Sequence, residues 1–156
     1  MQTQQPMAML GGLTASEFMQ RYWQKKPLLV RQAFIQFQPL LSRQQLFALA
    51  ASPEVGSRLV QGTGRDWQMR HGPLNARQRP AFAQPHWTLL VQGVDLHATA
   101  AADFLKAFRF VPDARLDDLM ISWASNGGGV GPHFDSYDVF LVQAQGQRRW
   151  RYGAQK

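Results

Sequence analysis

A histidine and an aspartate stand two positions apart in the run GPHFDSYD, near the end of the 156-residue sequence. The β-branched and aromatic residues 139–142 that follow predict a β-strand, in which positions i and i+2 project from the same face. His133 and Asp135 would then point together. An imidazole and a carboxylate suit a divalent transition metal, and a second histidine would complete the facial triad of oxygen-activating Fe(II) sites. The pair is therefore predicted to bind iron, although an isolated H-x-D triplet also occurs around purely structural histidines.

The run GGGVGP at residues 127–132 precedes this pair. A phosphate-binding loop would lead into the N-terminus of a helix, whereas a strand is predicted to follow here. The glycines are better interpreted as a turn in which backbone and ligand approach closely, with Pro132 fixing the start of the metal-binding strand.

The last predicted strand, RRWRY at 148–152, places Arg148, Trp150 and Tyr152 on one face. If that face points inward, the buried guanidinium of Arg148 needs an anion to offset its desolvation. A dicarboxylate cosubstrate would supply one, because the planar guanidinium can hold a carboxylate with two charge-assisted hydrogen bonds. An internal Asp or Glu is the alternative partner.

Tyr137 and Asp138 follow the metal pair and could line a pocket for a basic or polar side chain. The alternative is core packing for Tyr137 and turn solvation for Asp138. The other histidines, His71, His86 and His97, are dispersed upstream, and we expect each to be structural.

The rest of the sequence predicts a mainly β fold of the α+β class. Helices are expected at 14–25, where Thr14 and Glu17 form a capping box, at 42–51 and at 98–110. Strands are expected at 27–30, 57–62, 66–72, 86–94, 119–125, 133–145 and 148–152.

Composition excludes several classes of protein. With no cysteine, disulfides and thiolate metal sites are ruled out. Neither a signal peptide nor an apolar run long enough to span a bilayer is evident, so a cytoplasmic protein without membrane contact is expected. The net charge is +7, but the basic residues are dispersed and form no nucleic-acid motif, so direct nucleic-acid binding is not expected.

The run DDLMISWASNGGGVGPHFDSYDVFLVQAQGQRRWRYG, together with RYWQKKPLLVRQAF, SRLVQG, WQMRHGP and WTLLVQGV, resembles the JmjC/cupin-type oxygenases that depend on Fe(II) and 2-oxoglutarate, specifically the bacterial ribosomal oxygenases. The resemblance implies a double-stranded β-helix (jelly roll), iron bound by His133 and Asp135, and Arg148 on the far carboxylate of 2-oxoglutarate. It also implies a reaction with O2 that hydroxylates an arginine of a ribosomal protein and yields succinate and CO2. Tyr137 and Asp138 would suit a basic substrate.

The sequence also departs from the family pattern. The family takes its second iron-binding histidine from a strand well downstream, and no histidine follows His133. We therefore expect a single but truncated JmjC/cupin-type domain over 1–156, with N-terminal helices and flanking strands in 1–112 and the first strands of the β-helix in 113–156. A noncatalytic cupin-like binding module or an inert fragment is the alternative, and a histidine hydroxylase or demethylase is a third interpretation. Ribosome association and oligomeric state stay open.

Overall fold

The computed structural model describes residues 4–153, which fall into two compact units. Residues 40–133 form one unit, here called the sheet unit. Residues up to 39 and from 134 onward form the other, here called the terminal unit. The boundary in the second half of the chain lies between His133 and Phe134. The predicted single domain with its division at residue 112 stays a prediction.

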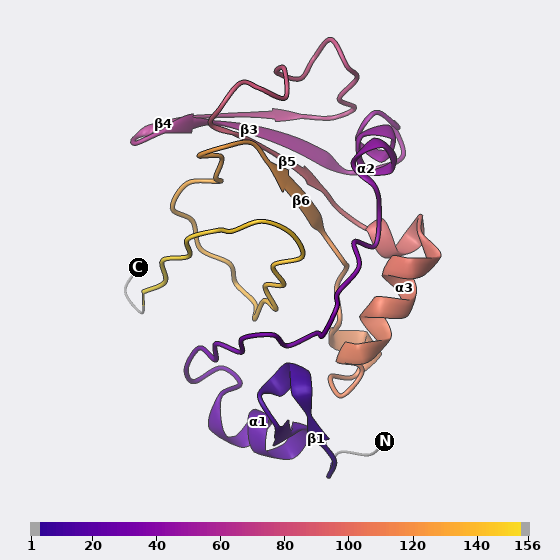
Figure 1. Ribbon diagram of the computed structural model, residues 1–156, viewed down its shortest axis with the longest axis vertical. Coiled ribbons are helices and arrows are strands. Elements are labelled where there is room, and N and C mark those ends of the chain that lie inside the picture. The colour runs from indigo at the N-terminus through magenta and orange to yellow at the C-terminus, as the bar shows by residue number, and fades with distance from the viewer. Residues whose placement is uncertain (1–3, 154–156) are drawn as a thin grey trace. The chain divides into compact units, whose positions relative to one another are not determined.

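The sheet unit is built on four antiparallel strands in the order β4-β3-β5-β6 (Figure 1). The strands are β3 (Ser57–Thr63), β4 (Asp66–His71), β5 (Trp87–Val91) and β6 (Ile121–Ala124). Leu59 of β3 lies opposite Leu89 of β5, which in turn lies opposite Trp123 of β6. These four strands confirm the prediction for this part of the chain.

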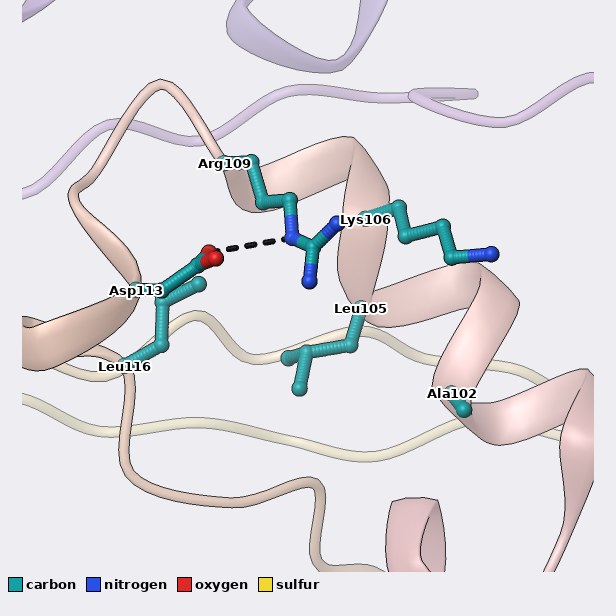
Figure 2. A pocket seen from close by; sticks show the side chains of 6 residues that line it. All are labelled: Ala102, Leu105, Lys106, Arg109, Asp113 and Leu116. Carbon is teal, nitrogen blue, oxygen red and sulfur yellow. Dashed lines mark ion pairs between the residues drawn. The ribbon is translucent and has the colours of Figure 1, made fainter.

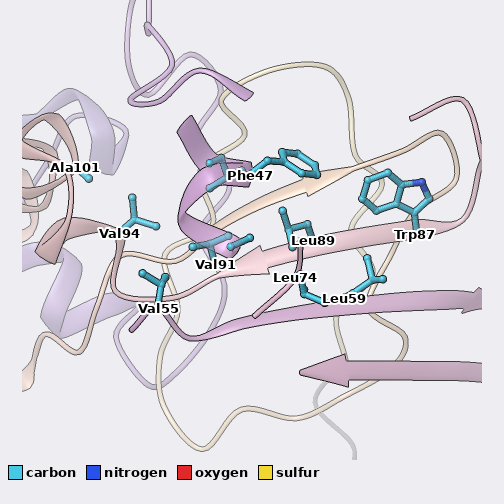
Figure 3. Packing of buried hydrophobic residues seen from close by; sticks show 11 residues of the cluster. Phe47, Val55, Leu59, Leu74, Trp87, Leu89, Val91, Val94 and Ala101 are labelled. Atoms are coloured by element: carbon cyan, nitrogen blue, oxygen red, sulfur yellow. The ribbon is translucent and has the colours of Figure 1, made fainter. Parts of the chain in front are cut away.

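One face of the sheet carries the hydrophobic core. Paired residues across a sheet point to the same side, so Leu59, Leu89 and Trp123 share that face. The helix α2 (Arg43–Ala50) contributes Phe47, whose ring centroid lies 6.2 Å from that of Trp87. Figure 3 shows this buried cluster, which consists of Leu46, Phe47, Ala50, Val55, Leu59, Leu74, Trp87, Leu89, Val91, Val94 and Ala101.

Helix α2, expected at 42–51, begins with a capping box. The Ser42 hydroxyl of α2 accepts a hydrogen bond from the Gln45 backbone N–H at 3.2 Å, and the Gln45 side chain accepts one from the Ser42 N–H at 2.9 Å. This reciprocal capping box satisfies backbone donors at the helix start. The helix predicted at 98–110 is α3 (Thr99–Leu105) continued by the 3-10 turn η3 (Lys106–Phe108). Two further 3-10 turns are η2 (Val94–Leu96) and η4 (Asp113–Arg115).

The terminal unit has little regular structure. A short antiparallel pair, β1 (Pro6–Met7) and β2 (Leu13–Thr14), flanks the 3-10 turn η1 (Ala8–Leu10) and precedes α1 (Ala15–Arg21). The predicted Thr14 capping box with Glu17 is present at the start of α1. Phe18 of α1 is buried, and its ring centroid lies 5.9 Å from that of Phe140. The aromatic contact thus joins α1 to the chain after residue 133.

Four predictions from the sequence are wrong for segments that lie mainly in the terminal unit. Helix α1 ends at Arg21 instead of residue 25. Residues 27–30 form no strand, and Leu29 is 78% exposed. No strand is present in the described residues 134–153, although 133–145 and 148–152 were expected to form two. A β-strand exists only when a neighbouring strand takes up its backbone N–H and C=O groups, and apolar composition alone does not supply that neighbour.

Candidate metal centre

The glycine-rich run begins as a turn bonded to the first residue of β5. The Trp87 N–H donates to the Ser125 hydroxyl at 3.1 Å, and the Ser125 N–H donates to the Trp87 carbonyl at 3.0 Å. The Gly128 N–H then donates to the Ser125 carbonyl at 2.9 Å. A Cβ on Gly128 would lie 2.3 Å from the Trp87 carbonyl oxygen. The backbone therefore lies too close to β5 for any side chain at this position.

His86 closes the other side of the turn. Its N–H donates to the Asn126 carbonyl at 2.9 Å, and its Nδ1 lies 3.3 Å from the Gly127 carbonyl oxygen. His86 has a φ of 64°, which is uncommon for a residue with a side chain. Gly127 has a φ of 67°, and a Cβ there would lie 2.7 Å from the His86 ring. His86 thus has the structural role expected of it, although its contact with residues 126 and 127 could not be predicted from the local sequence.

The second half of the turn lies against Trp67 of β4. A Cβ on Gly131 would lie 3.1 Å from two carbons of the indole, and one on Gly129 would lie 3.5 Å from it. The Trp67 Nε1–H donates to the Gly64 carbonyl at 3.0 Å, which holds the indole in place. The close approach predicted for these glycines is therefore an approach to protein groups of the same unit.

His133 is exposed, and its Nδ1 lies 2.9 Å from the Gly131 carbonyl oxygen. Because a carbonyl oxygen only accepts hydrogen bonds, this contact is a hydrogen bond when Nδ1 carries a proton. In many metal-binding histidines one ring nitrogen binds the metal and the other donates to a carbonyl or carboxylate. The contact between His133 and Gly131 is compatible with that arrangement.

Asp135, Tyr137 and Asp138 lie in the terminal unit, and all three are exposed. The Asp138 carboxylate accepts a hydrogen bond from the Gln24 N–H at 3.3 Å. Within residues 4–153 no group of three or more His, Asp or Glu side chains is arranged to hold a metal. The assignments of His133 and Asp135 to a metal, and of Tyr137 and Asp138 to a substrate, stay predictions.

Arg148 is half-buried in the terminal unit, and burial lowers the pKa of its guanidinium from the ordinary value. Its guanidinium carbon lies 5.5 Å from the centroid of the Trp150 ring. Trp150 and Tyr152 are 45% and 81% exposed, so the inward-facing aromatic face expected of a strand is not formed. A partly desolvated guanidinium on an aromatic ring is suited to binding a carboxylate, because little water competes with the anion.

Two pockets lie among the described residues of the sheet unit, and neither is lined by His133. One of about 170 Å³ lies beside α3 and η4, and it contains two cationic side chains (Figure 2). Arg109 Nε lies 3.0 Å from an Asp113 carboxylate oxygen, and Lys106 Nζ lies 2.6 Å from an Asp103 oxygen. Both cations are thus paired with acids. A second pocket, of about 410 Å³ between α2 and the start of α3, is lined mainly by Leu and Ala side chains and includes His97.

Comparison with known proteins shows which proteins this chain is similar to. Residues 103–156 match the JmjC domain family. The chain is 44% identical over 137 residues to the ribosomal protein uL16 3-hydroxylase of Escherichia coli (strain K12), covering 88% of this chain and 36% of that protein. It is 36% identical over 142 residues to a probable ribosomal oxygenase of Haemophilus influenzae, covering 90% of this chain and 35% of that protein. The chain is related to the JmjC-type ribosomal oxygenases.

The solved structures of ribosomal oxygenases extend the relationship to the fold. The structure of YcfD, a ribosomal oxygenase from Escherichia coli, matches with a TM-score of 0.72 and 41% identity, covering 79% of this chain and 34% of that one. The predicted fold class, mainly β and of the JmjC/cupin type, is therefore confirmed. YcfD has also been solved in complex with cobalt and 2-oxoglutarate, and with cobalt and succinic acid. The chain spans about a third of the length of the curated ribosomal oxygenases it matches.

No helix in the described part of the chain has the length and apolar character required to cross a membrane.

Proposed function

We propose that this chain carries iron-binding and 2-oxoglutarate-binding residues of an oxygenase that hydroxylates a ribosomal protein side chain. The observation that carries the proposal is the anchored turn ending in His133, whose Nδ1 lies 2.9 Å from the Gly131 carbonyl oxygen, in a chain 44% identical to a ribosomal protein hydroxylase. The complex of the related YcfD with cobalt and 2-oxoglutarate supports the binding of a metal and of 2-oxoglutarate, since cobalt can stand in for iron at nitrogen and oxygen donors.

His133 and Asp135 would hold Fe(II) through one imidazole nitrogen and one carboxylate. The facial triad needs a further histidine, which the described residues do not bring to this pair. Iron with bound 2-oxoglutarate would supply the oxygen-activating chemistry that no protein side chain provides. Arg148 would hold the far carboxylate of 2-oxoglutarate through its guanidinium and so orient the cosubstrate.

The overall reaction we propose consumes one O2, one 2-oxoglutarate and one C–H bond. One oxygen atom enters the new hydroxyl group, and the other enters succinate as 2-oxoglutarate loses CO2. Arginine is the proposed target, because the exposed Asp138 carboxylate and Tyr137 ring would suit a cationic side chain. A ribosomal protein substrate would place the reaction in the cytoplasm. The enzyme would bind this substrate through protein contacts, without a nucleic-acid-binding motif.

The proposal is tested by incubating the protein with Fe(II), 2-oxoglutarate, O2 and a uL16 peptide. We expect succinate to form together with a mass increase of one oxygen atom on an arginine. His133→Ala and Asp135→Ala should abolish both products. Arg148→Ala should raise the 2-oxoglutarate concentration needed for half-maximal turnover roughly 10- to 100-fold, because hydrogen bonds to a charged group are lost. Undiminished turnover in His133→Ala would contradict the assignment.

The alternative is a noncatalytic cupin-like binding module, favoured by the absence of a three-ligand group within residues 4–153. Retention of the uL16 peptide by the wild-type protein, with no hydroxylation and no effect of His133→Ala on retention, would support that alternative.

A further inference from the structure

We propose that Arg43 and Arg79, here called the arginine pair, form with Phe82 a binding surface for single-stranded RNA on the sheet unit. Both guanidinium groups lie against the Phe82 ring, and no acidic side chain of residues 4–153 is paired with either of them. The choice of RNA over DNA rests on the proposed function, because a ribosomal protein substrate is met together with RNA. The surface itself does not require the metal centre.

The segment 72–86, which joins β4 to β5, lies beside helix α2 (Figure 1). Near the start of the segment, the N–H of the buried Leu74 donates to the Ala50 carbonyl at the end of α2, at 2.7 Å. Further along the segment, the Phe82 ring centroid lies 5.3 Å from that of Phe47 on α2. The segment is therefore held against the helix at two points.

Phe82 is packed against aromatic residues of the core and still reaches the surface. Its ring centroid lies 5.5 Å from that of Trp123 and 6.4 Å from that of Trp87. Phe82 is nevertheless 38% exposed. The ring is therefore held in place from within the protein while part of it faces solvent.

Each member of the arginine pair contacts this ring. The guanidinium carbon of Arg43 lies 4.2 Å from the Phe82 ring centroid, and that of Arg79 lies 4.5 Å from it. The Arg79 guanidinium carbon also lies 4.8 Å from the Phe47 ring centroid. A cation at such a distance is attracted by the π electrons of the ring, which orients the side chain without using its N–H donors. The pair thus presents two oriented sets of donors to an anion.

The segments around the pair carry positive charge only. Residues 40–53 and 67–94 contain no Asp and no Glu, and their Lys and Arg residues are Arg43, Arg70, Arg77 and Arg79. The Arg70 guanidinium donates to the Gln78 carbonyl at 3.0 Å, which adds a further contact to the segment 72–86. The arginines are dispersed in the sequence and become neighbours only in the fold. A surface with this charge attracts a polyanion.

Single-stranded RNA fits this surface better than an acidic peptide does. Both partners supply anions, because the planar guanidinium group can hold a phosphate as well as a carboxylate. Unpaired bases additionally stack on aromatic rings and on guanidinium planes, whereas Asp and Glu side chains offer no such stacking. The combination of two arginines with a partly exposed aromatic ring therefore favours RNA.

The test measures the binding of a fluorescent oligouridylate to the protein by fluorescence anisotropy, without iron or 2-oxoglutarate. The double variant Arg43→Gln/Arg79→Gln should weaken binding about 10-fold or more, because charge-assisted hydrogen bonds to phosphate are lost. The slope of log K against log salt concentration should become shallower by about 1.4, the value for two phosphate contacts on a single strand. Phe82→Leu should weaken binding about 5-fold or more through the lost ring.

Two further double variants serve as controls. Arg65→Gln/Arg115→Gln removes the same charge from two exposed arginines elsewhere in the sheet unit, and it should keep nearly the wild-type affinity and salt slope. Arg43→Lys/Arg79→Lys keeps both charges and guards against a loss of folding in the glutamine variant. It should keep the salt slope but bind more weakly than the wild type, because lysine lacks the planar guanidinium group.

Three results would overturn the inference. Equal weakening in the two glutamine double variants would show that net charge alone attracts the RNA. Equal competition by a polyglutamate peptide of matched charge would assign the surface to an acidic peptide. We expect oligouridylate to bind at least as tightly as oligodeoxythymidylate, and tighter binding of the DNA would overturn the choice of RNA.

The hydroxylation assay separates this inference from the proposed function. RNA binding that depends on the arginine pair, in a protein that does not hydroxylate the uL16 peptide, would refute the proposed function alone. Hydroxylation of the peptide by a protein that does not bind oligouridylate would refute the RNA-binding surface alone.

Discussion

Strand β5 and the segment 139–142 have nearly the same kind of sequence, WTLLV and VFLV, but opposite structures. Every residue of β5 is buried, and the strand is paired with β3 on one side and β6 on the other. Val139 and Leu141 are 48% and 59% exposed, and their segment forms no strand. The difference shows that β-prone side chains become a strand only where both the backbone groups and the apolar face find partners.

The largest effect is expected from the buried indole of the sheet unit. Trp87→Ala should lower the free energy of unfolding by about 3–5 kcal/mol, because it removes a fully buried ring from the core. Trp150→Ala in the half-exposed segment should change it by less than about 0.5 kcal/mol. Urea denaturation of both variants measures the contrast. Comparable losses in the two would show that the terminal segment contributes to a core as β5 does.

Substitutions in the turn after β6 should lower the free energy of unfolding less than the loss of Trp87 from the core does. Gly128→Ala should cost about 1–3 kcal/mol, because the new methyl group would meet the Trp87 carbonyl oxygen at 2.3 Å and force the turn away from β5. Gly129→Ala, with its Cβ in ordinary contact, should cost clearly less. Equal stabilities of the two variants by urea denaturation would mean that the turn is not anchored to β5.

A smaller effect is expected at the start of α2. Ser42→Ala should cost about 1 kcal/mol, since it removes the hydroxyl that accepts the Gln45 N–H. Ser136→Ala, at an exposed position of the terminal unit, is the control and should be close to neutral. The comparison uses thermal unfolding of both variants, and a neutral Ser42→Ala would argue against the capping box.

The smallest effect is a pH dependence in the terminal unit. Hydrogen bonds from the Thr14 N–H and hydroxyl lower the pKa of Glu17 below its ordinary value. Its contribution is therefore present above the unfolded pKa and is lost as pH falls through the folded pKa. Thermal unfolding at neutral and strongly acidic pH should show a slightly larger acid loss for the wild type than for Glu17→Gln. An identical loss would show that the carboxylate does not contribute to the cap.

The same contrast explains what could be predicted from the sequence. The Thr14 capping box and the strands β3 and β4 depend on residues close together in the chain, and their positions were predicted correctly. The strands expected at 27–30 and in 133–152 were wrong, because pairing depends on segments that the local sequence does not specify. His133 could be selected by residue type and spacing. The approach of the preceding glycines to Trp67 could not, since these segments lie more than 60 residues apart in the sequence.

The central claim is that the anchored turn presents His133 as a metal ligand together with Asp135. Anaerobic titration of the protein with Fe(II) in the presence of 2-oxoglutarate, followed by calorimetry, tests it most directly. We predict saturable binding that is lost in His133→Ala and in Asp135→Ala and retained in His97→Ala, which removes an exposed histidine elsewhere in the sheet unit. Absence of binding to the wild type, or binding unchanged by His133→Ala, would contradict the account.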